Sequence, residues 1–121
     1  MQKVFVTGMG VISSLGVGKE ANLDRLCSGK GGIGRASVFE SKYTESLFFG
    51  EVNLSDDALK ELTDNQGSTD LSRTALLAFY AAEEAIKQAG LSKEDLSSYR
   101  TGIISSSTVG GMCNTVSLYN D

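Results

Sequence analysis

The sequence predicts an α/β domain, and three stretches of its 121 residues carry that prediction. Residues 4–7 hold the apolar run Val-Phe-Val and indicate a buried strand, which the turn Gly8-Met9-Gly10 ends. Residues 71–89 are rich in alanine and indicate a long helix, and residues 101–107 indicate a second strand after it. A strand, a glycine turn and a helix in this order open many α/β domains.

Length and charge describe one ordinary globular domain. A compact domain of 121 residues buries roughly two-thirds of its unfolded surface, which leaves no room for a second complete domain. The formal net charge of −4, without a cluster of Lys or Arg, argues against nucleic acid as a partner. No apolar run approaches the ~20 residues of a membrane span, and the N-terminus does not read as a signal peptide. We therefore expect a cytoplasmic protein without a membrane partner.

The chain lacks histidine and has only two cysteines, so acid–base catalysis within it would need carboxylates, Lys or Tyr. The chain contains no histidine, so it lacks the side chain that ordinarily titrates near neutral pH, and no Cys–His or Ser–His pair can form within it. Its two cysteines, Cys27 and Cys113, are too few for a disulfide scaffold or a zinc site. We expect no metal and no cofactor.

The glycine turn after the first strand also raises a dinucleotide-binding alternative. That fingerprint needs a third glycine where this chain has Ser13, and no strand ending in an acidic residue follows at the expected distance. Residues 17–20 are not a phosphate loop either, because the upstream glycine is missing and Glu20 replaces the hydroxyl residue. Dinucleotide binding is therefore the less favoured interpretation.

Residues 19–28 follow as a short amphipathic helix with Gly29 as its C-terminal cap. Cys27 lies on the apolar stripe of this helix, and we expect it to be a small buried hydrophobe rather than a reactive thiol. Residues 29–34 form a glycine-rich loop with Lys30 and Arg35 at its edges. Such a loop can hold an anion, but a solvated connector is the favoured interpretation.

The middle of the chain predicts irregular structure and one small helix. Residues 38–52 contain most of the aromatic side chains, which indicates an irregular segment over the core with a short strand near residues 47–52. Residues 56–63 predict a small polar helix, and residues 64–69 a linker. Beyond the long helix, the capping-box spacing of Ser92 and Asp95 predicts a single helical turn over residues 92–97.

The long helix at residues 71–89 is the element around which we expect the domain to pack. Apolar residues recur on one stripe at helical spacing: Leu71, Ala75, Ala78, Phe79, Ala82, Ala85, Ile86 and Ala89. Most of these side chains are methyl groups, so the stripe should be buried in close packing. A polar face in the second half should be wet: Glu83, Glu84, Lys87 and Gln88. Asp70 or Ser68 should cap the first turn, and Gly90 should close the last one.

Five segments, in the correct order, resemble the N-terminal part of the β-ketoacyl-acyl carrier protein synthases, which are elongating condensing enzymes of the thiolase superfamily. They are Val4 to Ser13, Leu26 to Ile33, Phe49 to Val52, Ser72-Arg73 with Ala89-Gly90-Leu91, and Gly102 to Met112. Each motif alone is weak, but together they run in register over nearly the whole chain. The resemblance implies that residues 1–121 are an incomplete N-terminal part of such a domain. The implied fold is α/β, part of the N-terminal half of a thiolase-like fold with a mixed sheet and helices on both faces.

The resemblance also implies an activity and partners. Family members condense an acyl thioester with malonyl-acyl carrier protein to give 3-oxoacyl-acyl carrier protein, in fatty acid or polyketide synthesis. Their reactive cysteine and two histidines lie beyond the part that this chain matches, so we expect no catalytic residue here and no activity from this chain alone. Acyl carrier protein bearing acyl or malonyl groups is the implied partner, and the full-length protein is expected to be a homodimer.

One binding position carries over from the family by motif. A branched aliphatic residue before a Gly-Gly pair lies at the mouth of the acyl pocket, which corresponds to Val109, Gly110 and Gly111 here, although Val109 can also be plain core. Glycines at such a place allow another backbone or a ligand to approach closely. Cys113 follows this pair without a basic partner, and we interpret it as structural.

Departures from the family pattern keep other interpretations open. The family usually has proline at the position of Ser14 and aspartate at that of Ser72. It usually has glycine at the positions of Ser106 and Thr108. Bulkier residues beside the pocket indicate a narrower or more polar entrance, hence a specialised synthase or a non-catalytic partner like a chain-length factor. A self-contained interaction module is a further alternative, and it would unfold cooperatively by itself.

Overall fold

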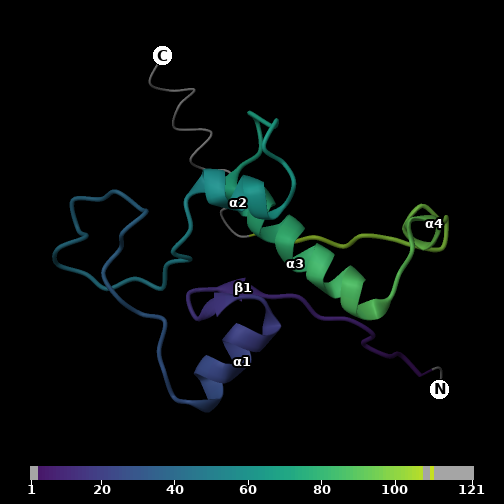
Figure 1. Ribbon diagram of the computed structural model, residues 1–121, viewed down its shortest axis with the longest axis horizontal. Helices are drawn as coiled ribbons and strands as arrows, with labels where there is room; N and C mark the ends of the chain where they lie inside the picture. The colour runs from purple at the N-terminus through teal and green to yellow at the C-terminus, as the bar shows by residue number, and fades with distance from the viewer. Residues whose placement is uncertain (1–2, 108–109, 111–121) are drawn as a thin grey trace.

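The computed structural model of the protein describes residues 3–107 and residue 110 (Figure 1). Its elements in chain order are β1 Ile12–Ser13, β2 Gly16–Val17, α1 Lys19–Cys27, α2 Asp56–Leu62, α3 Arg73–Ala89 and α4 Lys93–Leu96. The hairpin and α1 lie on one side of α3, and α2 packs against the N-terminal part of α3 (Figure 1). A long irregular connection joins α1 to α2. The long helix α3 is therefore the element on which α2 and the hairpin pack, whereas α1 packs on the hairpin.

The hairpin β1–β2 is held from the helix that follows it. The two strands pair antiparallel, with Ser13 opposite Gly16. Asn22 of α1 is buried, and its Nδ2 donates to the carbonyls of Gly16 and Gly18 at 2.9 and 2.7 Å. Its Oδ1 accepts from Ser13 Oγ at 2.5 Å. Because one amide side chain is bonded to both strands and to the turn before α1, the hairpin and α1 form one unit.

The segment before the hairpin lies close against the backbone of α3. A Cβ atom added to Gly8 would overlap the carbonyl oxygen of Ala85, and one added to Gly10 would overlap that of Ala81. Alternate residues of an extended segment thus meet successive turns of a helix whose side chains here are methyl groups. This contact confirms the expected close packing of the alanine-rich helix.

Polar side chains of α3 fix the same segment. Glu84 accepts from the backbone N–H groups of Val11 and Lys19 at 2.9 and 2.7 Å, and Gln88 Oε1 accepts from Met9 N–H at 2.7 Å. The N–H of Lys19, and then that of Val11, lowers the pKa of Glu84 below its ordinary value. The prediction of a wet face was wrong for Glu84, which is half-buried and accepts backbone N–H groups that the sequence pattern does not place, whereas Gln88 is exposed as predicted.

An arginine at the start of α3 ties this helix to the segment that leads into α2. The guanidinium of Arg73 donates to the carbonyls of Val52 and Leu54 at 2.7 and 2.8 Å, and to Asp56 Oδ1 at 2.7 Å. The planar fork of a guanidinium suits such simultaneous contacts. It brings the first turns of α2 and α3 together.

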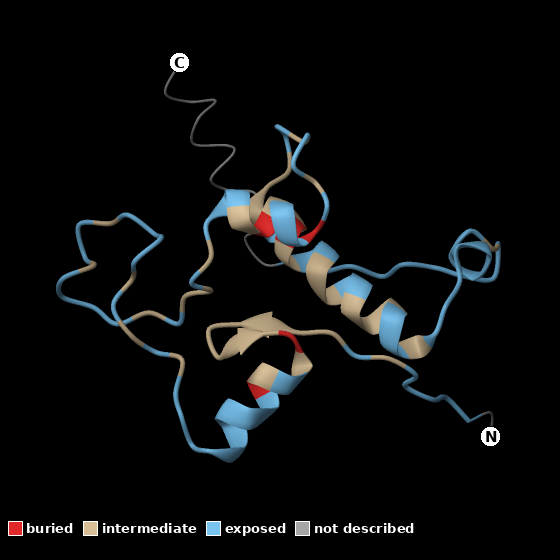
Figure 2. Ribbon diagram, viewed as in Figure 1, coloured by how far each residue is buried: buried red, intermediate tan, exposed pale blue. Residues whose placement is uncertain are grey.

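The apolar core of the described residues is small and lies between α2 and α3. Leu59 and Leu76 are each 0% exposed. Thr63 is buried beside them and donates its hydroxyl to the carbonyl of Leu59 at 2.8 Å. Most of the remaining chain is exposed or half-buried (Figure 2).

The two predicted strands are wrong in this structure. Residues 4–7 and residues 101–107 form no strand, and Val4, Ile103 and Ile104 are 94%, 93% and 102% exposed. A strand requires a neighbour for its backbone N–H and C=O groups, and neither segment pairs with another among the described residues. The predicted strand near residues 47–52 is reduced to one bridge between Gly34 and Phe49.

The predicted buried stripe of α3 is also only partly correct. Ala78, Phe79 and Ala82 are exposed, whereas Leu76, outside that stripe, is buried. The helix meets α2 and the N-terminal segment with one side and leaves the Phe79 side uncovered by described residues. An alanine-rich helix has small side chains on several faces, so periodicity alone did not select the correct one.

Local signals at helix ends were mostly read correctly. Gly90 is left-handed with φ 66°, and Gly29 after α1 has φ 67°. The capping box of Ser92 and Asp95 is present at α4. At α3 the cap is Ser72, not Asp70 or Ser68, because Ser72 directly precedes the first helical residue and its Oγ accepts from the N–H of Ala75 at 3.2 Å.

The expected burial of Cys27 was wrong, because Cys27 is exposed at the end of α1. The hairpin covers the Asn22 side of this helix and leaves Leu23 and Leu26 exposed as well. Along the part of the chain that the structure describes, no helix combines the length and the apolar character that crossing a membrane requires.

We predict that Glu84→Ala lowers the free energy of unfolding by about 1–2 kcal/mol, because two backbone N–H groups lose a charged acceptor that is itself partly exposed. Urea denaturation followed by circular dichroism measures it. Glu83→Ala is the matched control, since Glu83 is the exposed neighbour on the same helix.

The contribution of Glu84 to folding stability should decrease as the pH falls. A carboxyl whose pKa is lowered by folding stabilises the folded state above the unfolded value, here 4.5, and loses that contribution as the pH falls through the lowered value. The difference between the wild type and Glu84→Ala should therefore be full at pH 7 and shrink below pH 4.5. A difference that stays constant down to acid pH would contradict the assigned role.

We predict that Gly10→Ala destabilises the protein by about 1–3 kcal/mol, since the new methyl group overlaps the backbone of α3. Thermal unfolding measures the change. Gly102→Ala is the control, because a Cβ there meets nothing within 4 Å. Equal stability of the two variants would show that the segment does not lie on α3.

Candidate functional site

The predicted acyl-pocket residues fall at the limit of the described chain. Val109 and Gly111 lie outside the described residues, as does Cys113. Gly110 is exposed, and its N–H donates to Ser107 Oγ at 2.9 Å. A Cβ on Gly110 would lie 3.0 Å from Cγ2 of Thr74, so Gly110 is next to the first turn of α3. The role of the three residues at a pocket mouth stays a prediction.

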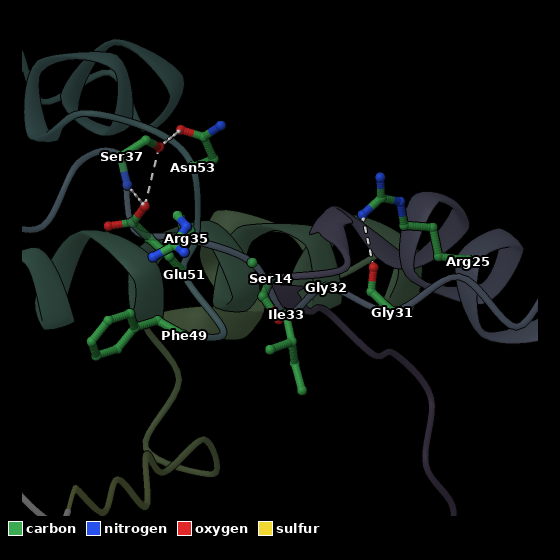
Figure 3. A pocket seen from close by; sticks show the side chains of 11 residues that line it. Ser14, Arg25, Gly31, Gly32, Ile33, Arg35, Ser37, Phe49, Glu51 and Asn53 are labelled. Carbon is green, nitrogen blue, oxygen red and sulfur yellow. Dashed lines mark hydrogen bonds between the residues drawn. The ribbon is translucent and has the colours of Figure 1, made fainter. Parts of the chain in front are cut away.

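A cavity of about 240 Å³ lies where the glycine-rich loop meets the segment before α2 (Figure 3). It is lined by Ser14, Arg25, Gly31, Gly32, Ile33, Gly34, Arg35, Ser37, Phe49, Glu51 and Asn53. In the view of Figure 3, Arg25 lies beside Gly31 on one side and Arg35 beside Glu51 on the other. The loop that was interpreted as a solvated connector thus forms one wall of a cavity.

Glu51 organises one end of this cavity. Its carboxylate accepts from three consecutive backbone N–H groups, those of Ser37 at 2.7 Å, Val38 at 3.1 Å and Phe39 at 2.6 Å. The N–H of Ser37 is the largest cause that lowers the pKa of Glu51. Glu51 is therefore ionised at neutral pH and holds the turn at residues 37–39 against its own segment.

Arg35 holds the neighbouring part of the loop. Its Nη1 donates to the carbonyls of Thr44, at 3.2 Å, and Glu45. Its guanidinium carbon lies 5.4 Å from the centre of the Phe48 ring, within range of a cation–π contact. The side chain is positioned by these contacts and still has N–H groups that can donate elsewhere.

The side chains around this cavity are suited to binding acceptor groups. Arg25, Arg35 and backbone N–H groups are donors, and Ser14 has a hydroxyl group that can donate as well, whereas the hydroxyl of Ser37 donates to Asn53 Oδ1 at 2.9 Å. Across the residues the structure describes, no group of three or more His, Cys, Asp or Glu side chains is arranged to hold a metal ion. The cavity supplies hydrogen-bond donors rather than a nucleophile with a base.

The glycine-rich loop could be predicted from the sequence, but most of the cavity could not. Lys30 and Arg35 are the charged residues of the loop in the sequence, whereas the cavity is lined by Arg35 and Arg25. A signal for Arg25 exists, because it stands in the last turn of α1 shortly before the glycines. Nothing in the sequence pattern indicates that Glu51 bonds to residues 37–39, since the contact depends on how the irregular connection folds back.

Comparison with known proteins decides the family. The family model described as "Beta-ketoacyl synthase, N-terminal domain" matches residues 1–121. The chain belongs to this family. Membership implies a thiolase-like α/β fold. The described residues form helices and a two-stranded sheet. Membership also confirms the resemblance read from the five motifs.

Several relatives are similar over most of this ketoacyl synthase chain. A 3-oxoacyl-[acyl-carrier-protein] synthase 1 of Haemophilus influenzae is 32% identical, with 94% of this chain and 27% of the relative covered. The protein of the same name in Escherichia coli K12 is 31% identical over 91% of this chain and 27% of its own length. The tetracenomycin polyketide synthase ketoacyl synthase alpha subunit of Streptomyces glaucescens is 32% identical over 94% of this chain and 26% of its own length. No solved structure matches the chain. The chain thus spans about a quarter of the length of these relatives.

We predict that Glu51→Ala makes the backbone amides of residues 37–39 exchange with solvent severalfold faster, because all three lose their acceptor. Hydrogen–deuterium exchange of peptides covering this turn measures it. Glu45→Ala is the control, since Glu45 takes part through its backbone carbonyl. Unchanged exchange in Glu51→Ala would show that the carboxylate does not hold the turn.

Proposed function

We propose that the protein carrying this chain condenses an acyl thioester with malonyl-acyl carrier protein. The reaction releases CO₂ and gives 3-oxoacyl-acyl carrier protein, in fatty acid or polyketide synthesis. The observation that carries the proposal is the match of the ketoacyl synthase family over residues 1–121. The names of the relatives, a 3-oxoacyl-acyl carrier protein synthase and a polyketide ketoacyl synthase subunit, support it.

Residues 1–121 contribute scaffold to this reaction, as an incomplete N-terminal part of the ketoacyl synthase domain. The chain contains no histidine, whereas the family reaction uses a cysteine and two histidines, so this chain alone is inactive. Exposure of the apolar runs at residues 4–6 and 103–104 supports an incomplete structure. We place both runs as strands in a mixed sheet, with helices on both faces, in the complete protein.

Val109, Gly110 and Gly111 form the mouth of the acyl pocket in this proposal. The family motif supports the assignment, and the position of Gly110 beside Thr74 is compatible with a role for the start of α3 in the same region. Acyl carrier protein bearing acyl or malonyl groups is the partner, and the full-length protein acts as a cytoplasmic homodimer. The net charge of −4 argues against a nucleic-acid partner, and the proposed protein binds no membrane.

A non-catalytic partner like a chain-length factor is the second candidate. Ser106 and Thr108, where the family usually has glycine, favour it because bulkier residues narrow the pocket entrance. The two candidates differ downstream, where a synthase has the reactive cysteine and the partner lacks it.

We predict that the full-length protein makes 3-oxoacyl product from acyl- and malonyl-acyl carrier protein, and that a chain of residues 1–121 makes none. Mass spectrometry of the carrier-bound products measures both. Product from the short chain would contradict the scaffold role. A full-length protein that has the downstream cysteine but gives no product would contradict the synthase assignment.

A further inference from the structure

The first turn of α3 is held in place from several sides. Ser72 Oγ caps it by accepting from the N–H of Ala75 at 3.2 Å, and the guanidinium of Arg73 donates to two backbone carbonyls and one carboxylate. Leu76, at the end of this turn, is 0% exposed in the apolar core. A segment that lies against this turn therefore meets a fixed surface.

Gly110 lies against this turn at Thr74, which is exposed. A Cβ on Gly110 would lie 3.0 Å from Thr74 Cγ2 and 2.5 Å from Ser107 Oγ, so a methyl group there would crowd the first atom and overlap the second. The N–H of Gly110 donates to the same Ser107 Oγ at 2.9 Å. The Cβ side of Gly110 is thus filled by one methyl group and one hydroxyl group.

The segment between α4 and Gly110 has little support along its middle. Ile103 and Ile104 are almost fully exposed, and a Cβ on Gly102 would meet nothing within 4 Å. The contact with Thr74 comes at the end of this segment, where α3 is firmly held. Thr74 therefore fixes how closely the end of the segment approaches α3.

Gly110 belongs to the mouth of the acyl pocket in the proposed function, on which the following step rests. Since Thr74 and Ser107 fill the Cβ side of Gly110, an acyl chain passes on another side of this backbone. We propose that Thr74 is a positioning residue for the mouth. Its Cγ2 methyl keeps Gly110 away from α3, which narrows the mouth and favours straight acyl chains over chains with a methyl branch.

The test compares octanoyl- and isooctanoyl-acyl carrier protein as substrates of the full-length protein, with malonyl-acyl carrier protein as the second substrate. The two chains have equal numbers of carbon atoms, and the second has a methyl branch near its end, so they differ in width more than in apolar character. The readout is the ratio of kcat/KM for the branched chain to that for the straight chain.

Thr74→Ser removes the Cγ2 methyl and keeps the hydroxyl, so Gly110 can move towards α3 and the mouth widens. We expect the ratio to rise about threefold. This is less than the roughly 10–200-fold effect of one methylene that contacts a substrate directly, because Thr74 acts through Gly110. Thr74→Val keeps a methyl at this position and should retain the wild-type ratio. Thr69→Ser is the matched control, since it removes the same group from an exposed threonine before α3.

Gly110→Ala should change the ratio in the opposite direction. Its methyl group overlaps Ser107 Oγ and crowds Thr74, so the backbone moves away from α3 and the mouth narrows. The opposite signs expected for Thr74→Ser and Gly110→Ala separate a change in the mouth from a loss of folding, which lowers kcat/KM for both chains alike.

An unchanged ratio in Thr74→Ser would overturn the role of Thr74, and so would an equal change in Thr74→Val. Equal losses with both substrates would do the same, since they indicate a merely structural role. In each of these cases the wild type still makes 3-oxoacyl product, so the proposed function stands. A wild type that makes no product from either substrate overturns the proposed function and the role of Thr74 together.

Discussion

The arrangement of the described residues depends on the contact between the N-terminal segment and α3. At Gly8 and Gly10 the two backbones approach as closely as glycine permits, and Glu84 adds bonds to the N–H groups of Val11 and Lys19, on either side of the hairpin. One carboxylate therefore joins the start of the hairpin and the start of α1 to the long helix. Since the leucine core lies between α2 and α3, this polar contact, rather than the core, positions the hairpin.

Helices could be predicted from the sequence because their signals are local. Gly90 ends α3, and Ser92 with Asp95 begins α4, through contacts within a few residues of the chain. Strands could not, since Val4 to Val6 and the pair Ile103 and Ile104 are apolar enough for a strand but have no pairing neighbour among the described residues. The chain spans about a quarter of its relatives, and family membership implies a larger α/β fold.

The faces of α3 show a second limit of sequence patterns. Ala78, Phe79 and Ala82 form a valid apolar stripe, yet the described residues pack against the side that carries Leu76 and Glu84. A carboxylate that accepts two backbone N–H groups has the same helical position as one in water, so hydropathy cannot distinguish them. The distinguishing facts are the positions of Val11 and Lys19, which are more than sixty residues away in the sequence.

The hairpin connects this polar contact to the cavity. β1 packs on α3, and Glu84 accepts from the N–H of Val11 just before this strand. The turn of the hairpin, at Ser14, is where Gly32 and Gly50 approach from the two walls of the cavity. The glycines of the loop thus have two different physical roles: Gly32 permits close packing, and its neighbours leave N–H groups free. A solvated connector does not need the close packing at Gly32, whereas N–H groups without a protein acceptor are ordinary where Gly31 and Ile33 are exposed to water. Glu84 of α3 bonds to the chain on both sides of the hairpin, and Asn22 of α1 bonds to Ser13 beside the turn. The cavity walls that approach this turn are therefore linked to the long helix through the hairpin and α1.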